Sequence, residues 1–369
     1  MNSMIIPVRA RTALVIITMI AGIVACRHDA LEDLVPSSAP GSVNVDPSTV
    51  PYATLSEYGL FQGALASLDP HPEVLPYDVI TPLFSDYAKK ARFVWMPSGS
   101  RASYAGDHEV LAFPERSVLI KTFYYDHVQP GDGRKILETR LLIRANGEWV
   151  SATYVWNAEQ TEAYLDMTGS NVPITWMDEQ DQMRNVTYRI PAGAECFTCH
   201  KQSGVTIPIG PKPRNLDRVF NYGEGDVGQL EKWVQHGYLE PGYPASIDRV
   251  TAWDDESEDL SDRVRSYLDM NCAHCHGEQR HCDYRPMRFA WELTADPVNL
   301  GLCVEPDEQI LPFDAYIVSA GNVDKSMMHY RISSTEVSER MPLLGRTLVH
   351  QEAVDMIADW ILQLSPPCN

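Results

Sequence analysis

Between residues 51 and 190, the hydrophobic positions along the chain fall in short runs that are typical of β-strands. Three runs there are especially rich in β-branched and aromatic residues, and they lie at residues 117–126, 135–144 and 148–157. Asn146-Gly147 separates the last two runs and is a pair that a two-residue type I′ turn favours. The three runs therefore predict an antiparallel meander.

Shorter hydrophobic runs add candidate strands to this meander. They lie at residues 92–96, 109–113 and 186–190. Many short antiparallel strands in succession are typical of two packed sheets. We therefore expect residues 51–190 to fold as an antiparallel, sandwich-like β domain.

The pattern changes to helical spacing in the C-terminal third of the chain. Hydrophobic residues recur every three or four positions at residues 260–270, 325–332 and 353–364. A shorter helix is predicted at residues 227–239, after a Pro-rich stretch. The predicted fold class is therefore α+β and multidomain, with a small segment at residues 191–253 after the β domain and an all-α domain at residues 254–369.

The N-terminus has the features of an export signal. An apolar run at residues 12–24 follows a basic start and is shorter than the roughly 20 residues that span a bilayer, although a retained membrane anchor stays an alternative. The sequence IVAC, which ends at Cys26, resembles a bacterial lipobox. We expect residues 1–25 to be a signal peptide and residues 26–50 to be a flexible linker lipidated at Cys26. Arg27 follows the expected lipidation site. A residue other than Asp at this position is typical of bacterial lipoproteins that continue to the outer membrane, so we expect the protein there, on the periplasmic side or at the cell surface.

The formal net charge of −20 argues against binding to nucleic acid, because a phosphate backbone requires Lys and Arg. It favours solubility or docking to a basic partner. Acidic residues concentrate at 254–259. We interpret this run as a solvated linker, with a docking patch as the alternative.

Two C-x-x-C-H motifs carry the chemistry. With 8 Cys and 11 His in 369 residues, chance would produce on the order of 0.005 such matches, so two copies are not accidental. Two thiols at this spacing can form thioethers with a haem while the adjacent imidazole binds the iron. We expect two covalently bound haems c, with Cys196, Cys199 and His200 holding the first and Cys272, Cys275 and His276 holding the second.

The alternatives for a C-x-x-C pair are half of a zinc site or a redox dithiol. A structural zinc site requires four ligands, and a thioredoxin-like motif requires a βαβ context. An adjacent His in both copies is required only by haem. The export signal is consistent with this interpretation, because C-x-x-C-H haem attachment happens outside the bacterial cytoplasm.

The second axial ligands differ in how well the sequence specifies them. Met341 lies in a Met-Pro loop whose irregular backbone allows its side chain to point at an iron, so we expect it to bind the second haem. Met327, Met328 and a purely packing role are the alternatives. For the first haem, the weak candidates are His236, Met177 and Met183, and an open position is also compatible with the sequence.

The remaining cysteines are Cys282, Cys303 and Cys368. Two of them are expected to pair in an oxidising compartment, and a bond between Cys282 and Cys303 would close the shortest loop. The other two pairings and free, buried thiols stay open.

The C-terminal hundred or so residues resemble class I c-type cytochromes in their entry helix, C-x-x-C-H motif, Met-Pro loop and Trp-bearing final helix. Nearly the whole mature chain resembles an uncharacterised bacterial family of dihaem c-type cytochromes. The resemblance rests on LSEYGLF (55–61), PLFSDYAKK (82–90), KTF (121–123), ETR (138–140), YVWN (154–157), ECFTCH (195–200) and RSYLDMNCAHCH (265–276). Members often accompany a secreted parallel β-helix protein, which the resemblance implies as a candidate redox partner.

Three classes of function follow. The first is an electron carrier in the periplasm or at the outer membrane, which requires no catalytic residue. The second is a peroxidase-like dihaem enzyme, in which the first haem would keep an open distal site. The third is a β domain that binds a polymer or a partner and is served by the haems.

Overall fold

The computed structural model describes residues 41–311 and 314–368, which belong to one unit of the chain. The expected signal peptide and Cys26 lie outside these residues. Within the described ranges, no helix is long and apolar enough to cross a bilayer.

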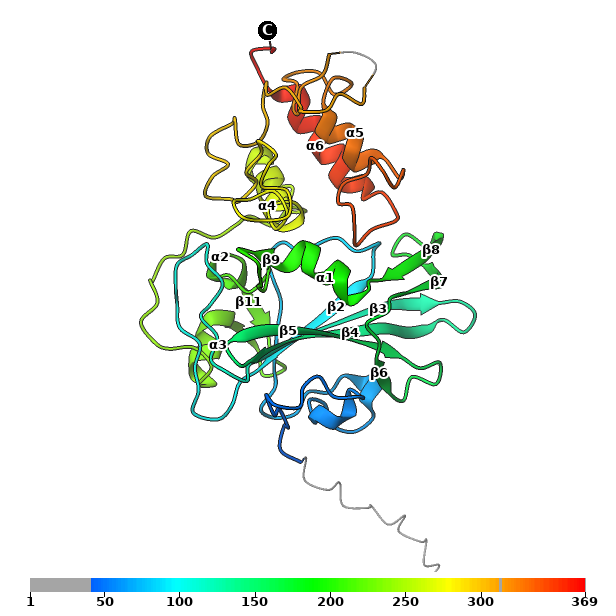
Figure 1. Ribbon diagram of the computed structural model, residues 1–369, viewed down its shortest axis with the longest axis vertical. Coiled ribbons are helices and arrows are strands. Elements are labelled where there is room, and N and C mark those ends of the chain that lie inside the picture. The colour runs from blue at the N-terminus through cyan, green and yellow to red at the C-terminus, as the bar shows by residue number, and fades with distance from the viewer. Residues whose placement is uncertain (1–40, 312–313, 369) are drawn as a thin grey trace, which may run out of the picture. The chain divides into compact units, whose positions relative to one another are not determined.

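The centre of the fold is an eight-stranded antiparallel sheet (Figure 1). Its strands are β1 (Leu75–Tyr77), β2 (Lys89–Trp95), β3 (Val118–Val128), β4 (Gly133–Ala145), β5 (Glu148–Trp156), β6 (Ala163–Leu165), β7 (Ser170–Met177) and β8 (Met183–Ile190). Strands β1 to β6 pair in chain order, and β7 pairs with both β3 and β8. Strands β3 to β6 follow one another through short connections, whereas residues 96–117 form a long connection from β2 to β3.

The long predicted strands are confirmed as β3, β4 and β5. Asn146 and Gly147 connect β4 to β5 with φ of 55° and 80°, the positive values that a type I′ turn requires at both positions. The runs at 92–96 and 186–190 lie largely within β2 and β8. The run at 109–113 is not a strand, since only its Ala112 forms an isolated bridge, to Ser103.

The prediction of a sandwich is wrong, because the strands form one sheet whose two faces are covered by other parts of the chain. Residues 43–74 pack on one face together with Phe93, Ile120 and Tyr154. The expected linker at 26–50 therefore ends early, since Val43 and Val45 are already buried in this cluster. On the other face, α1 lies against β5.

The helices are short and the connections between them are long. They are α1 (Gly193–His200), α2 (Pro213–Leu216), α3 (Gln229–Gln235), α4 (Leu260–Asn271), α5 (Met327–Ser333) and α6 (Gln351–Gln363). Two small ladders, β9 (Lys201–Gln202) with β10 (Val205–Thr206) and β11 (Val219–Asn221) with β12 (Asp226–Gly228), lie between α1 and α3, and the 3-10 helices are η1 (Ser56–Tyr58) and η2 (Leu65–Ser67).

The predicted all-α C-terminal domain is contradicted, and with it the fold class. The helices expected at 260–270, 325–332 and 353–364 are present as α4, α5 and α6, but they contain only 12, 7 and 13 residues. Irregular backbone makes up most of the rest of this region. Side chains form hydrogen bonds with backbone groups in this irregular region. Arg346, for example, donates to the carbonyl oxygens of Met341, Leu348, Arg331 and Ser334. The large antiparallel sheet dominates the chain as a whole.

The disulfide joins Cys303 to Cys368, so the expected pairing of Cys282 with Cys303 is wrong. The residues after α6 return to the segment that follows Cys303, where the N–H of Ala320 lies 3.3 Å from the Sγ of Cys368. Cys282 is buried elsewhere, with its N–H donating to the carbonyl of Cys275. Proximity in the fold, and not loop length, decided the partner.

Reduction of this disulfide is expected to destabilise the C-terminal region. The two cysteines are 65 residues apart, and a loop of that length corresponds to about 4 kcal/mol of unfolded-state entropy. The midpoint of denaturant unfolding should therefore fall when reductant is added. Cys282→Ala should keep that sensitivity and Cys303→Ala should lose it; equal sensitivity in both variants would contradict the pairing.

Candidate functional site

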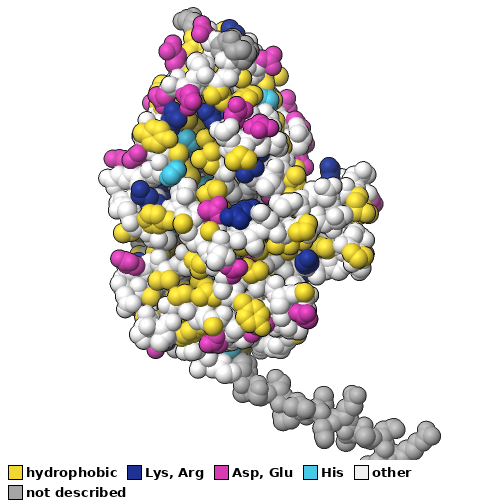
Figure 2. Space-filling view, turned by 45° about the vertical axis from the view of Figure 1, so that its right-hand side comes forward, with side chains coloured by type: hydrophobic (Ala, Val, Ile, Leu, Met, Phe, Trp, Pro, Cys, Tyr) yellow, Lys and Arg dark blue, Asp and Glu magenta, His cyan; other side chains and the backbone are white. Residues whose placement is uncertain are grey.

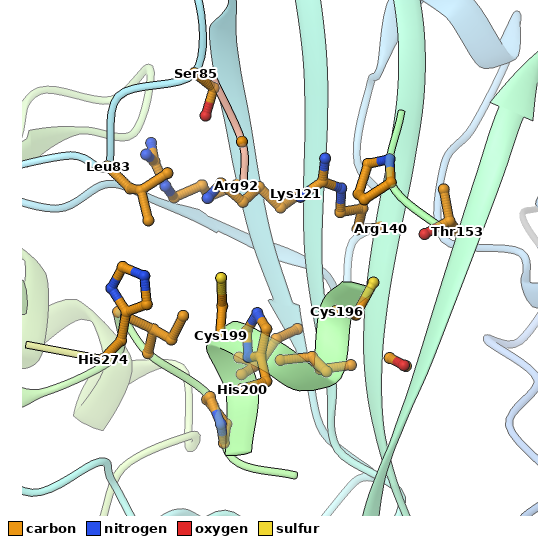
Figure 3. A pocket seen from close by; sticks show the side chains of 18 of the residues that line it. Leu83, Ser85, Arg92, Lys121, Arg140, Thr153, Cys196, Cys199, His200 and His274 are labelled. Atoms are coloured by element: carbon orange, nitrogen blue, oxygen red, sulfur yellow. The ribbon is translucent and has the colours of Figure 1, made fainter. Parts of the chain in front are cut away.

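The first C-x-x-C-H motif occupies α1, directly after the last strand of the sheet. Glu195 sets the start of this helix, because its carboxylate accepts from the N–H of Ala192 at 2.5 Å and pairs with Arg189 at 2.8 Å. The carboxylate also lies at the positive end of the helix dipole. Cys196 and Cys199 follow one turn apart on the side that faces the sheet (Figure 3).

His200 ends α1 in a form suited to bind a metal. Its Nδ1 lies 2.7 Å from the carbonyl oxygen of Ile207, and because a carbonyl only accepts, Nδ1 must carry the proton. Burial lowers the pKa of His200 to about 4, so the ring is neutral near pH 7. A neutral ring protonated on Nδ1 leaves a lone pair on Nε2, and a second-shell bond of this type is usual for a ligand imidazole.

A cavity separates α1 from the sheet; we call it the sheet-side cavity. It contains about 1410 Å³ of space not filled by protein atoms, part of it open to solvent. Its wall is formed by the two motif cysteines and His200, by the sheet, by Pro208–Pro211, and by Met270 and His274 from the second motif's surroundings. This space can hold a large planar group beside the motif.

Three cations stand side by side on the sheet across from α1. Arg92 on β2 is opposite Lys121 on β3, and Lys121 is opposite Arg140 on β4. All three line the sheet-side cavity (Figure 3). Like charges directly opposite in a sheet are destabilising unless an anion compensates them. This cation row therefore marks the wall of the cavity where an anionic group would be stabilised.

Protein carboxylates neutralise only part of the cation row. Arg92 pairs with Asp78 at 2.5 Å, and Arg140 pairs with the buried Glu138 at 2.5 Å. Within the described ranges, the Lys121 ammonium forms no ion pair. Burial, with the repulsion of Arg92 next, holds the pKa of Lys121 well below its usual range. An acceptor in the cavity would relieve this cost.

The second motif follows the C-terminal end of α4. Asp259 caps this helix by accepting from the N–H groups of Ser261 and Asp262 at 2.9 and 3.2 Å. His276 is buried, and its ring lies edge-on to Phe289 with centroids 5.4 Å apart. Burial lowers its pKa to about 4, and its Nδ1 has no hydrogen-bond partner among the described residues.

Cys272 and His276 line a second cavity with the expected ligand Met341; we call it the helix-side cavity. It contains about 1130 Å³ of unfilled space, again partly open. Met327 and Met328 also line it, so the structure brings all three methionine candidates to one place. Only Met341 lies on a loop, where its N–H donates to Arg331 and its carbonyl accepts from Arg346, both at 2.9 Å.

The two motifs lie against each other, although 76 positions separate their His residues in the chain (276 − 200). The Sγ of Cys275 lies 3.9 Å from the carbonyl oxygen of Thr198. A small middle cavity of about 440 Å³ is lined by Cys199 and His274, which also line the sheet-side cavity, and by Cys272, His276 and Met341, which also line the helix-side cavity. The three spaces thus share their walls.

One group from both motifs could hold a metal ion by itself. A ligand atom from each of Cys199, His274 and Cys275 lies within 4.8 Å of the others. Hydrogen bonding from Cys275 lowers the pKa of Cys199, so this thiol approaches the thiolate form that metals bind. The set offers three ligands of the kind that a zinc or copper site uses.

Several candidates from the sequence lie elsewhere. His236 ends α3 and contacts Tyr238, while Met177 and Met183 lie at the β7–β8 turn; none of the three lines a cavity described above. The sequence reasoning missed His274 as a site residue. Its only local signal was its place inside the second motif.

The surface over the C-terminal residues mixes the two charges. On the face drawn in Figure 2, acidic and basic side chains are interspersed, and hydrophobic and His side chains reach the surface between them. The run at 254–259 is exposed and leads into the capped start of α4. This agrees with a solvated connection.

Comparison with known proteins returned nothing: no family model, no curated protein and no solved structure matches this chain.

Proposed function

We propose that this chain is a dihaem c-type cytochrome that passes single electrons in the periplasm or at the outer membrane. The observation that carries the proposal is the placement of two complete C-x-x-C-H motifs on cavities that share a wall. Electron transfer between two haems requires proximity, and the contact between Thr198 and Cys275, one residue from each motif, supports this part of the proposal.

The residues around the sheet-side cavity fit a haem. His200 presents an Nε2 lone pair, and Cys196 and Cys199 flank it in the same wall. The cation row matches the charge of the two haem propionates, which are carboxylates. Lys121 in particular lacks an ion-pair partner within the described ranges, and a propionate would be one.

The helix-side cavity fits a second haem. Cys272 and His276 lie in its wall together with four methionines, the three candidates and Met287, and most of the exposed lining surface is apolar. When bound, each haem would supply a one-electron Fe(III)/Fe(II) couple. The protein's own part is to bind the two groups, exclude water from them, and set their potentials through axial ligands and nearby charge.

The group Cys199–His274–Cys275 favours a second candidate, a mononuclear metal site. It would use one cysteine of each motif and neither terminal His. Cys196, Cys272, His200 and His276 would then have no role in their positions on the cavities, whereas two haems use all of them. We therefore prefer haem.

Export and a lipid anchor at Cys26 belong to the same proposal, because haem attachment takes place outside the cytoplasm. A redox partner protein is implied, and a secreted parallel β-helix protein is the candidate from the family resemblance. The net charge of −20 favours a basic partner and no nucleic acid.

A pyridine haemochrome assay on the full-length, exported protein is expected to give two haems per chain. Replacing both cysteines of one motif, Cys196 with Cys199 or Cys272 with Cys275, should leave one haem, because each motif attaches its own. Cys282→Ala is the matched control and should keep two. Stoichiometric zinc or copper with no haem would contradict the proposal and support the metal site.

A further inference from the structure

His274 is the one imidazole of the second motif that faces the first motif's cavity. It occupies a variable position of C-x-x-C-H and is 4% exposed. Its side chain lies in the wall of the sheet-side cavity together with His200 (Figure 3). One of its ligand nitrogens is within 4.8 Å of the Sγ of Cys199, a thiol of the first motif.

The hydrogen bonds of His274 match those of His200. Its Nδ1 lies 3.2 Å from the carbonyl oxygen of Met270, one turn earlier at the end of α4. Because the carbonyl only accepts, Nδ1 donates, and Nε2 is the ring nitrogen left to bind a metal. A backbone carbonyl on Nδ1 is the usual way in which a protein orients a ligand imidazole.

We infer that His274 is the second axial ligand of the haem attached at Cys196 and Cys199. This inference rests on the proposed function. The two imidazoles come from different parts of the chain, His200 from the end of α1 and His274 from the loop after α4, and both face the space between α1 and the sheet. The first haem then has two imidazole ligands and no open position.

Met270 and Lys121 also line this cavity and are of types that can bind an iron, as are Tyr77 and Tyr188, of which Tyr188 already donates its hydroxyl to Glu138. Met270 lies within α4, where its backbone carbonyl already orients His274. Lys121 lies in the cation row on the sheet, where a propionate is the better partner for its charge. Of these side chains, only His274 has a ring held by a carbonyl in the tautomer that coordination requires.

With this ligation, one short segment of the chain would bind both haems. The segment Cys272–His276 would attach the second haem through its cysteines and His276, and hold the iron of the first through His274. The first haem would have no vacant position for peroxide, which argues against the peroxidase-like alternative. It would also have the lower potential of the two if Met341 binds the second haem through its thioether, as proposed.

The test compares His274→Ala with wild type by haem count, ferric EPR and potentiometry. Wild type should show two low-spin haems. His274→Ala should keep two haems by pyridine haemochrome while half of the low-spin signal is lost to a high-spin form, and added imidazole should restore it. His236→Ala, which changes a residue that lines neither cavity, is the control and should match wild type.

The outcomes separate this inference from the proposed function. Two haems that stay low-spin with unchanged potentials in His274→Ala would overturn the inference alone. Fewer than two haems in wild type would overturn the proposed function instead. If His274→Ala fails to fold, near-infrared magnetic circular dichroism of the wild type decides: a bis-imidazole band beside a His–Met band is expected, and no bis-imidazole band would overturn the assignment.

Discussion

Met341→His is expected to lower the reduction potential of one haem and to leave the other unchanged. A thioether ligand stabilises ferrous over ferric iron relative to an imidazole, so removing it favours the ferric state. Axial ligand identity tunes haem potentials over about 0.8 V, and the shift should be a substantial part of that range. Spectroelectrochemical titration measures both potentials in one experiment.

The position of Met341 explains why only one haem should be affected. Met341 lines the helix-side and middle cavities with Cys272 and His276, while it is absent from the wall of the sheet-side cavity. The Arg346 guanidinium donates to the backbone carbonyl of Met341, and the N–H of Met341 donates to the carbonyl of Arg331. Because both bonds involve backbone atoms of Met341, the substitution should leave the loop conformation unchanged. The sulfur-to-iron charge-transfer band of the ferric protein should vanish with the higher potential.

Met327→Leu and Met328→Leu are matched controls, because both residues are buried in the same cavity wall and Leu conserves their volume. Neither should change the charge-transfer band. A Met341→His protein that keeps the band and its higher potential would show that Met341 only packs. Loss of the band in one of the Leu variants would then identify the ligand.

Asp86→Ala is expected to cause a large loss of stability. Asp86 connects the sheet region to the loop after Met341: its carboxylate accepts from the N–H groups of Thr347 and Leu348 at 2.7 to 2.9 Å and from the hydroxyl of Thr347 at 3.0 Å. Thr347 and Leu348 are half-buried, and an unpaired buried donor costs about 1–3 kcal/mol, so we expect a total loss of about 2–4 kcal/mol.

Denaturant unfolding and amide hydrogen exchange would measure this effect. Exchange should accelerate most at residues 340–350, whose backbone loses its anchor. Asp86→Asn retains an acceptor oxygen and should lose less. Asp166→Ala is the matched control, since Asp166 also binds a Thr N–H and hydroxyl, those of Thr168, but only two residues away and near the surface. Equal losses for Asp86→Ala and Asp166→Ala would contradict the role of Asp86.

Local patterns in the sequence determined the strands, the helices and the chemistry of the motifs. β-Branched and aromatic residues mark β3 to β5 in the sequence, and the backbone preference of Asn146-Gly147 determines the turn between β4 and β5. The C-x-x-C-H motif is local in the same sense, because its thiols and imidazole are neighbours in the chain. These features need no knowledge of distant residues.

Only the tertiary structure decided which of these pieces meet. Whether strands form one sheet or two depends on what covers their faces, and here residues 43–74 and α1 do so. Strand register placed Arg92, Lys121 and Arg140 in one row, and packing joined Cys303 to Cys368. His274 became a candidate ligand for the same reason: contacts between distant segments are selected by the free energy of burying many side chains together, which no short stretch of sequence contains.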